Sequence, residues 1–260
     1  MIMLLLFSCE GYNKLLKSQD PELKYSYAKK YFNQKKFTKS ASLLESVVHY
    51  YRGRPEGEEV LYMIAQSYYG QKDYGTASEY FKAYWNLYPR GEFTELSKYY
   101  SFYGLYLQSP DARLDQTPTH EAISQILLFL EDYPQSEQSV NAKEILFELQ
   151  DKLAYKEYRA AKLYYDLGTF MGNNYRACVL TADNVLKIYP FTNYREELYY
   201  LKIKSKHELA IVSDNELIQG RYRDVVDEYY NYMNEFPEGK YVKEVKKYFD
   251  YANSRIEKKF

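Results

Sequence analysis

Four segments of the chain end in an aromatic residue followed by proline, and apolar residues precede each ending at helical spacing. The endings are WNLYP, LEDYP, LKIYP and MNEFP, with prolines at positions 89, 134, 190 and 237. Twelve residues before each proline stands a small or slender residue, and larger apolar residues follow it. Proline cannot continue the hydrogen-bond ladder of a helix. Each segment is therefore predicted to be an amphipathic helix that ends just before its proline.

The small position and the larger apolar positions together describe the second helix of a helical hairpin. The small residues are Ala77, Ala122, Cys178 and Val225. The larger positions are Phe81 and Tyr84, Ile126 and Phe129, Ala182 and Val185, and Tyr229 and Tyr232, and a fifth unit without proline has Phe37, Ser40, Leu44 and Val47. A small residue lets the partner helix approach closely. The expected partners, the first helices, span residues 23–33, 58–69, 92–108, 142–167 and 196–212.

Two irregularities interrupt this pattern. The segment SPDARLDQTPTHEA, residues 109–122, separates the two helices of the third hairpin with turn-forming residues. From Gln135 to Leu167 the chain has no glycine or proline, which predicts one helix of about twice the usual length. We expect this helix to join an N-terminal half, residues 21–134, to a C-terminal half, residues 135–260.

The hairpin pattern resembles the tetratricopeptide repeat, a helix–turn–helix unit of about 34 residues. The second unit matches it best, with the positions Leu61, Ile64, Ala65 and Tyr68, and then Ala77, Phe81 and Pro89. The expected fold is therefore all-α, an α-solenoid of about five tetratricopeptide-like hairpins with a long helix between its halves.

The chain begins with MIMLLLFSCEG, an apolar run that is too short to span a bilayer. It is either a short buried segment or the end of a signal peptide. The order Leu6-Phe7-Ser8-Cys9 resembles a bacterial lipobox, which predicts that residues 1–9 end a lipoprotein signal peptide and that residues 10–20 form a tether. Cys9 would then carry acyl chains, which anchor a protein stably when two or more are present, at about 0.8 kcal/mol per buried methylene.

Composition and motifs point away from catalysis and from nucleic acid. The 35 basic and 36 acidic residues leave a net charge of −1, so no basic surplus suggests a nucleic-acid partner. Glycine-rich phosphate loops, metalloprotease motifs and nucleophile elbows are absent from the sequence. His49, His120 and His207 lie far apart, without partners at metal-ligand spacing. We expect no catalytic residues, no metal and no cofactor beyond the lipid on Cys9, with a hydrolase as the alternative.

Several segments together resemble the BamD family, the tetratricopeptide lipoproteins of the outer-membrane β-barrel assembly complex. They are Cys9 with the following YNKLLKSQDPELKYSYAKKYF, the hairpins FTKSASLLESVVHYY and DYGTASEYFKAYWNLYPRGEFTEL, the insertion SPDARLDQTPTHEAISQILLFLEDYPQS, and LQDKLAYKEYRAAKLYYDLGTF. The insertion is the most specific of them. The chain departs from the family in Phe7 of the lipobox, in the missing basic residues before the apolar run, and in looser C-terminal repeats.

This resemblance implies a non-enzymatic subunit on the periplasmic face of the outer membrane. Its C-terminal half would dock on the periplasmic domains of a BamA-like insertase, and its N-terminal half would receive unfolded outer-membrane proteins through their C-terminal strand. Two alternatives share the repeats: a scaffold lipoprotein of another envelope complex, and a carbohydrate-binding surface lipoprotein.

The residues themselves suggest where an extended segment could bind. In such hairpins, the face of the first helix that is turned away from the packing seam lines a groove. Counted from Ala28 and Ala65 as close-packed positions, this face carries the groove residues Tyr25, Lys29, Phe32, Tyr62, Gln66 and Tyr69. Aromatic rings with polar tips and a cation suit a segment that ends in an aromatic residue and a carboxylate. Tyr62 and Tyr69 are expected to lie off the packing seam.

Overall fold

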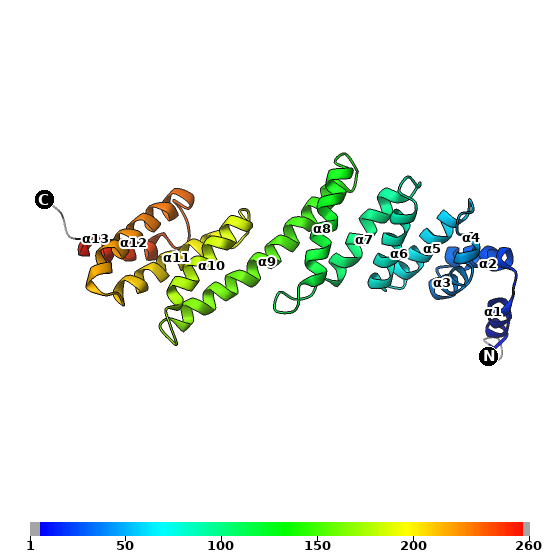
Figure 1. The fold of residues 1–260 in the computed structure, drawn as a ribbon, viewed down its shortest axis with the longest axis horizontal. Helices are drawn as coiled ribbons and strands as arrows, with labels where there is room; N and C mark the ends of the chain where they lie inside the picture. The colour runs from blue at the N-terminus through cyan, green and yellow to red at the C-terminus, as the bar shows by residue number, and fades with distance from the viewer. Residues whose placement is uncertain (1–5, 257–260) are drawn as a thin grey trace. The chain divides into compact units, whose positions relative to one another are not determined.

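The structure, a computed structural model, describes the backbone of residues 6–256 and the side chains of residues 11–256. Over this range the chain forms helices joined by turns, without any strand (Figure 1). The first eight helices are α1 (Leu6–Lys17), α2 (Pro21–Asn33), α3 (Phe37–Glu45), α4 (Val48–Tyr51), α5 (Gly57–Gly70), α6 (Tyr74–Leu87), α7 (Thr94–Gln108) and α8 (Thr117–Asp132). They are followed by α9 (Ser139–Leu167), α10 (Asn174–Ile188), α11 (Arg195–Ile211), α12 (Asn215–Glu235) and α13 (Val242–Arg255). Consecutive helices pack in pairs, which confirms the predicted all-α, hairpin-based fold class.

Contacts divide the chain into two compact units, Met1–Leu146 and Phe147–Phe260. The boundary lies inside α9, a helix of 29 residues that corresponds to the long helix predicted from the glycine- and proline-free stretch. The expected halves meet earlier, between residues 134 and 135, in the turn that precedes α9. Below, the two compact units are called unit 1 and unit 2.

The aromatic-proline endings stop their helices as predicted. Helices α6, α8, α10 and α12 each end two residues before the proline. The aromatic residue between them leaves the helical conformation, with φ between −122° and −134°, because a residue before proline is forced out of the α region. Its N–H still donates to the carbonyl four residues back, at 2.8 Å in all four helices. The small residues of the pattern, Ala77, Ala122, Cys178 and Val225, are all fully buried.

Unit 1 is built from hairpins whose neighbouring helices pack against one another. Helix α3 packs on α2 and α5, α6 on α5 and α7, and α8 on α7. Ala28, Ala65 and Phe81 are fully buried in its cores. A Cβ atom at Gly104 would lie 2.8 Å from the carbonyl oxygen of Tyr74, so only glycine permits this approach of α7 to α6.

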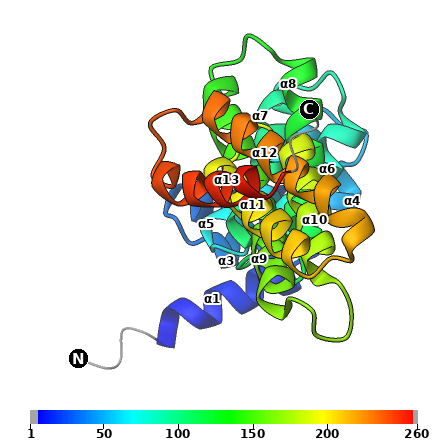
Figure 2. The ribbon, with the colours of Figure 1, turned by 90° about the vertical axis from the view of Figure 1, so that its left-hand side faces the viewer.

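Part of the segment expected as a tether is folded. Helix α1 projects from unit 1 (Figure 2) and packs against α2 through its C-terminal half. Leu15 is buried there, and the hydroxyl of Tyr12 donates to the carbonyl of Lys39 at 3.3 Å. Cys9 belongs to the part of α1 whose side chains lie outside the described residues, so its lipidation stays a prediction.

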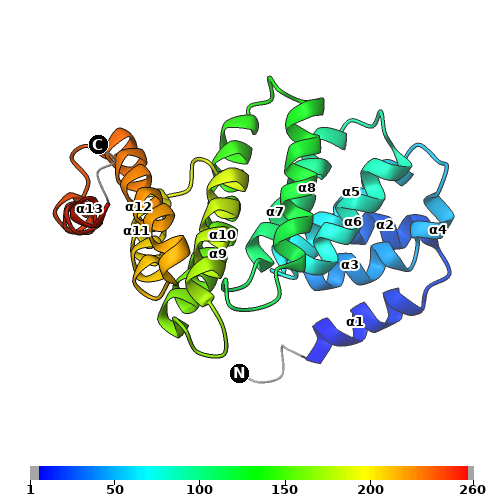
Figure 3. The ribbon, with the colours of Figure 1, turned by 60° about the vertical axis from the view of Figure 1, so that its left-hand side comes forward.

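Unit 2 repeats the hairpin arrangement with α10 on α11, α11 on α12 and α12 on α13 (Figure 3). Ala154 of α9 joins Ala182 and Leu198 in one of its cores. Helix α13 was not among the expected helices, and Val245 and Ala252 are its buried residues. Unit 2 also buries an ion-pair cluster, in which Glu228 of α12 contacts Lys202 and Lys206 of α11.

Candidate functional site

The six predicted groove residues occupy equivalent positions on two neighbouring first helices. Tyr25, Lys29 and Phe32 follow one another at spacings of four and three on α2, and Tyr62, Gln66 and Tyr69 do the same on α5. Residues at these spacings share one face of a helix. Since α5 contacts both α2 and α3, the two faces lie in adjacent hairpins of unit 1.

Two adjoining hollows lie along these faces. The first, of about 290 Å³, is lined by Lys29, Phe32, Asn33, Glu59, Tyr62, Met63, Gln66 and Phe93. The second, of about 410 Å³, is lined by Phe32, Asn33, Lys35, Phe37, Gln66, Tyr69, Gly70, Phe81 and Tyr100. Three residues, Phe32, Asn33 and Gln66, line both hollows. The structure therefore brings five of the six predicted residues to one elongated depression, which we call the unit 1 groove.

Tyr25, the sixth residue, lies next to the groove rather than in its lining. Its hydroxyl donates a hydrogen bond to the Glu59 carboxylate, and the Lys29 ammonium lies over its ring at 4.3 Å from the centroid. Lys29 also contacts Glu59 at 3.7 Å. Burial raises the pKa of Tyr25, and the hydrogen bond to Glu59 raises it further. The charges of Lys29 and Glu59 therefore offset each other at this end of the groove, and a ligand carboxylate would compete with Glu59 for the lysine.

Tyr62 differs from its expected role because its ring is part of the core. The side chain is only 7% exposed and stacks on Phe93, with centroids 4.2 Å apart and planes 8° from parallel. Its ring edges also contact Phe81 and Tyr84. Its hydroxyl accepts a hydrogen bond from Gln66 Nε2 at 2.8 Å. The expectation that Tyr62 lies off the packing seam is wrong, because its ring packs in the core between the helices. The same side chain also lines the groove.

Tyr69 is the more accessible of the two tyrosines. It is half-buried, and its ring contacts Tyr74 and Tyr100 edge-on, with centroids 5.4 and 5.1 Å away. Burial raises the pKa of both Tyr62 and Tyr69 to about 12, so both hydroxyls are neutral at physiological pH. They can donate or accept hydrogen bonds. This chemistry suits binding to a peptide backbone or a carboxylate.

Phe93 and Tyr100 also line the groove, although the first-helix faces did not predict them. Phe93 belongs to the turn between α6 and α7, and Tyr100 to α7 itself. A signal for Phe93 exists in the sequence: an aromatic residue stands four positions after the proline in three of the four endings, as Phe93, Tyr194 and Tyr241. Each of these rings stacks on a first-helix tyrosine, at centroid distances of 4.2, 5.3 and 4.0 Å.

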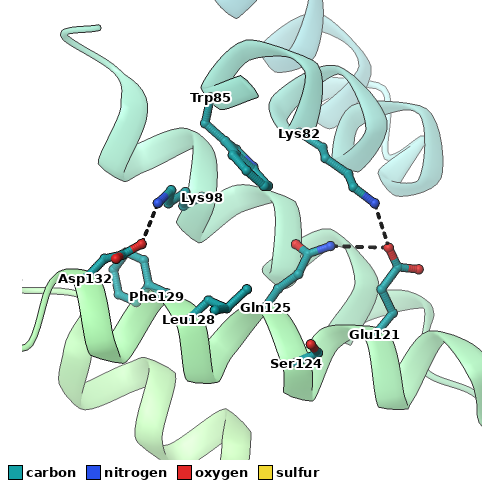
Figure 4. Close-up of a pocket in the computed structure, with 9 residues that line it drawn as sticks. All are labelled: Lys82, Trp85, Lys98, Glu121, Ser124, Gln125, Leu128, Phe129 and Asp132. Carbon is teal, nitrogen blue, oxygen red and sulfur yellow. Dashed lines mark hydrogen bonds and ion pairs between the residues drawn. The ribbon is translucent and has the colours of Figure 1, made fainter. Parts of the chain in front are cut away.

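A separate hollow of about 450 Å³ lies among α6, α7 and α8 of unit 1 (Figure 4). Ion pairs stand near its two ends, Lys82 with Glu121 at 3.1 Å and Lys98 with Asp132 at 2.5 Å. Between them the Trp85 ring faces α8, and its buried Nε1–H has no hydrogen-bond partner among the described residues. The hollow is thus an apolar slot between two charge pairs.

The 109–122 segment fixes the start of α8, which supplies most of this slot. The buried Gln116 side chain donates to the carbonyls of Asp111 and Leu114 at 2.9 and 3.1 Å. Gln116 in turn accepts a hydrogen bond from the Thr119 hydroxyl at 2.8 Å. The segment read from the sequence as an interruption is therefore an ordered turn that positions α8.

Residues 11–256 contain neither a metal-binding cluster nor a membrane-spanning helix. No group of three or more histidine, cysteine or acidic side chains in residues 11–256 is placed to hold a metal ion. Among the described helices, none is long and apolar enough to cross a membrane. Cys178, one of the small residues of the repeat pattern, has a free and buried thiol, and burial raises its pKa.

Comparison with known proteins identifies the family. The family model YfiO, described as an outer membrane lipoprotein, matches residues 17–216. No curated protein sequence matches the chain. The match covers α2 to α11 and therefore includes both the unit 1 groove and the insertion before α8. The chain belongs to the YfiO family of outer membrane lipoproteins.

Proposed function

We propose that this protein is a lipid-anchored subunit of the outer-membrane β-barrel assembly machinery. It is held at the periplasmic face of the outer membrane by acyl chains on Cys9. It binds unfolded outer-membrane proteins in the unit 1 groove and docks on the periplasmic domains of a BamA-like insertase through its C-terminal half. It works by binding alone, without a catalytic step.

The observation that carries this proposal is the shape and lining of the unit 1 groove. Two hollows joined through Phe32, Asn33 and Gln66 make a depression that suits an extended chain better than a compact small molecule. Apolar rings alternate with neutral polar tips, which can accommodate side chains and pair with backbone groups of an extended peptide. The Lys29 ammonium at one end provides a partner for a carboxylate.

The main alternative is a scaffold lipoprotein of another envelope complex, which would have the same fold and the same anchor. A pull-down from solubilised outer membrane separates the two, because the proposal requires a large β-barrel subunit among the captured proteins. Capture of another envelope complex without that subunit would replace the assembly role.

The anchor gives the first prediction. Cys9→Ser removes the thiol that would be acylated, so the variant is expected in the soluble periplasmic fraction instead of the outer-membrane fraction. Cell fractionation and intact-mass measurement of the native protein check this. Cys178→Ser is the matched control, because its thiol is buried in unit 2 and should not affect fractionation. A native protein that carries an unmodified N-terminal segment would contradict the anchor.

The groove gives the second prediction. A variant with Lys29→Gln and Tyr69→Ala is expected to bind a labelled peptide, the last strand of an outer-membrane barrel with a free carboxylate, about tenfold more weakly, a loss of about 1.4 kcal/mol. Both substitutions affect the groove lining and leave the Tyr62 ring in place. The measurement is fluorescence anisotropy.

The matched control uses the same residue types on another side of α2. Lys30 lies over the ring of Tyr27, which is 40% exposed, and neither residue lines the groove. Lys30→Gln with Tyr27→Ala should therefore leave the affinity unchanged. Equal losses in both variants would assign the binding to the overall charge and tyrosine content of α2 and would remove the groove from the proposal.

A further inference from the structure

The spacing that defines the unit 1 groove occurs again in unit 2. Helix α9 carries Tyr158, Lys162 and Tyr165 at spacings of four and three, and α11 carries Tyr200, Lys204 and His207 in the same way. Ala161 and Ile203, three residues after the first tyrosine in each helix, are fully buried, as Ala28 and Ala65 are in unit 1. Unit 2 therefore has a face equivalent to the groove face of unit 1.

Lys204 lies at the centre of an aromatic platform on this face. Its Nζ is 4.1 Å from the ring centroid of Tyr165 on α9 and 5.1 Å from that of Tyr200 on its own helix. Tyr200 stacks in turn on Tyr241, just before α13, at 4.0 Å with the planes 4° from parallel. All three tyrosines are half-buried, so part of the platform is exposed to solvent.

Lys162 and Lys202 of unit 2 form ion pairs with carboxylates, whereas Lys204 forms none with the described residues. Lys202 contacts Asp183 at 2.7 Å and Glu228 at 2.9 Å, and Lys162 contacts Asp166 at 2.8 Å. Among the described residues, no carboxylate lies within ion-pair distance of Lys204.

The pKa values of the two α11 lysines move in opposite directions. Burial lowers the pKa of Lys204, and the more distant carboxylates of Asp166 and Glu208 offset this only in part. Burial also acts to lower the pKa of Lys202, but its two carboxylate partners raise it overall. Lys204 is thus a partly desolvated cation that an added anion would stabilise.

We propose that the Lys204 platform is a binding site for a peptide carboxylate flanked by an aromatic or apolar side chain. The ammonium would pair with the carboxylate, and the rings of Tyr165, Tyr200 and Tyr241 would cover the neighbouring side chain. Such a charge-assisted contact strengthens where the cation is already partly removed from water. This inference concerns unit 2 alone and does not depend on the function proposed for the unit 1 groove.

Three short probes test the site and identify the source of the carboxylate. N-acetyl-Gly-Phe has a terminal carboxylate beside an aromatic ring, N-acetyl-Glu-Phe-amide has a side-chain carboxylate, and N-acetyl-Gly-Phe-amide has neither. Each probe is titrated into the purified full-length chain, and the Lys204 side-chain resonance and its pKa are followed by NMR. One or both carboxylate probes are expected to raise the pKa of Lys204, and the amide is expected to leave it unchanged.

Substitutions at Lys204 provide the second arm. Lys204→Met keeps most of the apolar stem and is expected to weaken binding of the carboxylate probe about tenfold or more, whereas Lys204→Arg retains most of it. Lys246→Met is the control, because it removes the same charge from an exposed ion pair with Asp250 on α13. Circular dichroism checks that each variant is folded. Equal binding of all three probes, or an unchanged pKa of Lys204 at saturation, would overturn the proposal.

Discussion

Tyr62→Ala is expected to lower the free energy of unfolding of unit 1 by about 3 kcal/mol or more. The Tyr62 ring packs face-to-face on Phe93 and edge-on against Phe81 and Tyr84, so removing it leaves a cavity between α5, α6 and the turn that follows. The cost is the lost burial of the ring plus the cavity that the neighbours fill only in part. Amide hydrogen exchange measures the effect in unit 1, and the amides of unit 2 serve as an internal reference.

Tyr62→Phe separates the ring from the hydroxyl. It keeps every ring contact and removes the oxygen that accepts a hydrogen bond from Gln66, so its stability should stay within about 1 kcal/mol of the native chain. If Tyr62→Ala proved as stable as Tyr62→Phe, the ring would not belong to the core. A groove experiment that uses Tyr62→Ala would otherwise confuse lost binding with lost folding, which is why Tyr69 is the better groove position.

The sequence predicted the hairpins well because proline and small residues act locally. Proline disfavours the helical conformation of the residue before it, so four prolines locate the ends of α6, α8, α10 and α12. The small positions are equally direct, since Ala77 and its equivalents are buried wherever the two helices of a hairpin touch. Both rules need only neighbours along the chain or in the adjacent helix.

Helices α1 and α13 were not predicted because neither has these local marks. Each lacks an aromatic-proline ending and buries few side chains: Leu15 is the buried residue described in α1, and Val245 and Ala252 are those of α13. Their positions depend on the surfaces of the neighbouring hairpins. A pattern within one segment cannot indicate whether such a surface exists.

The helix face that borders the groove was predicted from the sequence, but the burial of Tyr62 was not. Spacings of four and three place Tyr25, Lys29 and Phe32 on one face of α2, and the structure agrees that this face borders the hollows. Spacing cannot show that Phe93 returns from the next turn to cover Tyr62. The covering ring converts an apparently exposed position into a core position, and only the repeated aromatic residue four positions after proline hinted at it.

Glu228→Ala is expected to lower the free energy of unfolding of unit 2, because it removes the shared partner of a buried ion-pair cluster. Glu228 on α12 is 1% exposed and contacts Lys202 at 2.9 Å and Lys206 at 2.5 Å, and Lys202 also reaches Asp183 on α10. The cluster therefore links three consecutive helices, α10, α11 and α12. Removing one partner of a buried ion pair costs about 3 to 5 kcal/mol when the remaining charge is left unpaired. Lys202 keeps Asp183 as a partner and the Lys206 side chain is partly exposed, so we expect a loss at the lower end of this range, about 3 kcal/mol.

Thermal unfolding and hydrogen exchange of the full chain measure this loss, with the exchange of unit 1 amides as the reference that should not change. A compensating variant tests its cause. Combining Glu228→Met with Lys202→Met removes both buried charges, and replacing a buried ion pair with apolar residues of similar volume is often neutral or stabilising. The double variant should therefore be more stable than Glu228→Ala, although Asp183 and Lys206 lose a partner at the surface. If it were instead no more stable than Glu228→Ala, the loss would come from packing at this position, and the ion pair would hold α11 and α12 together only weakly.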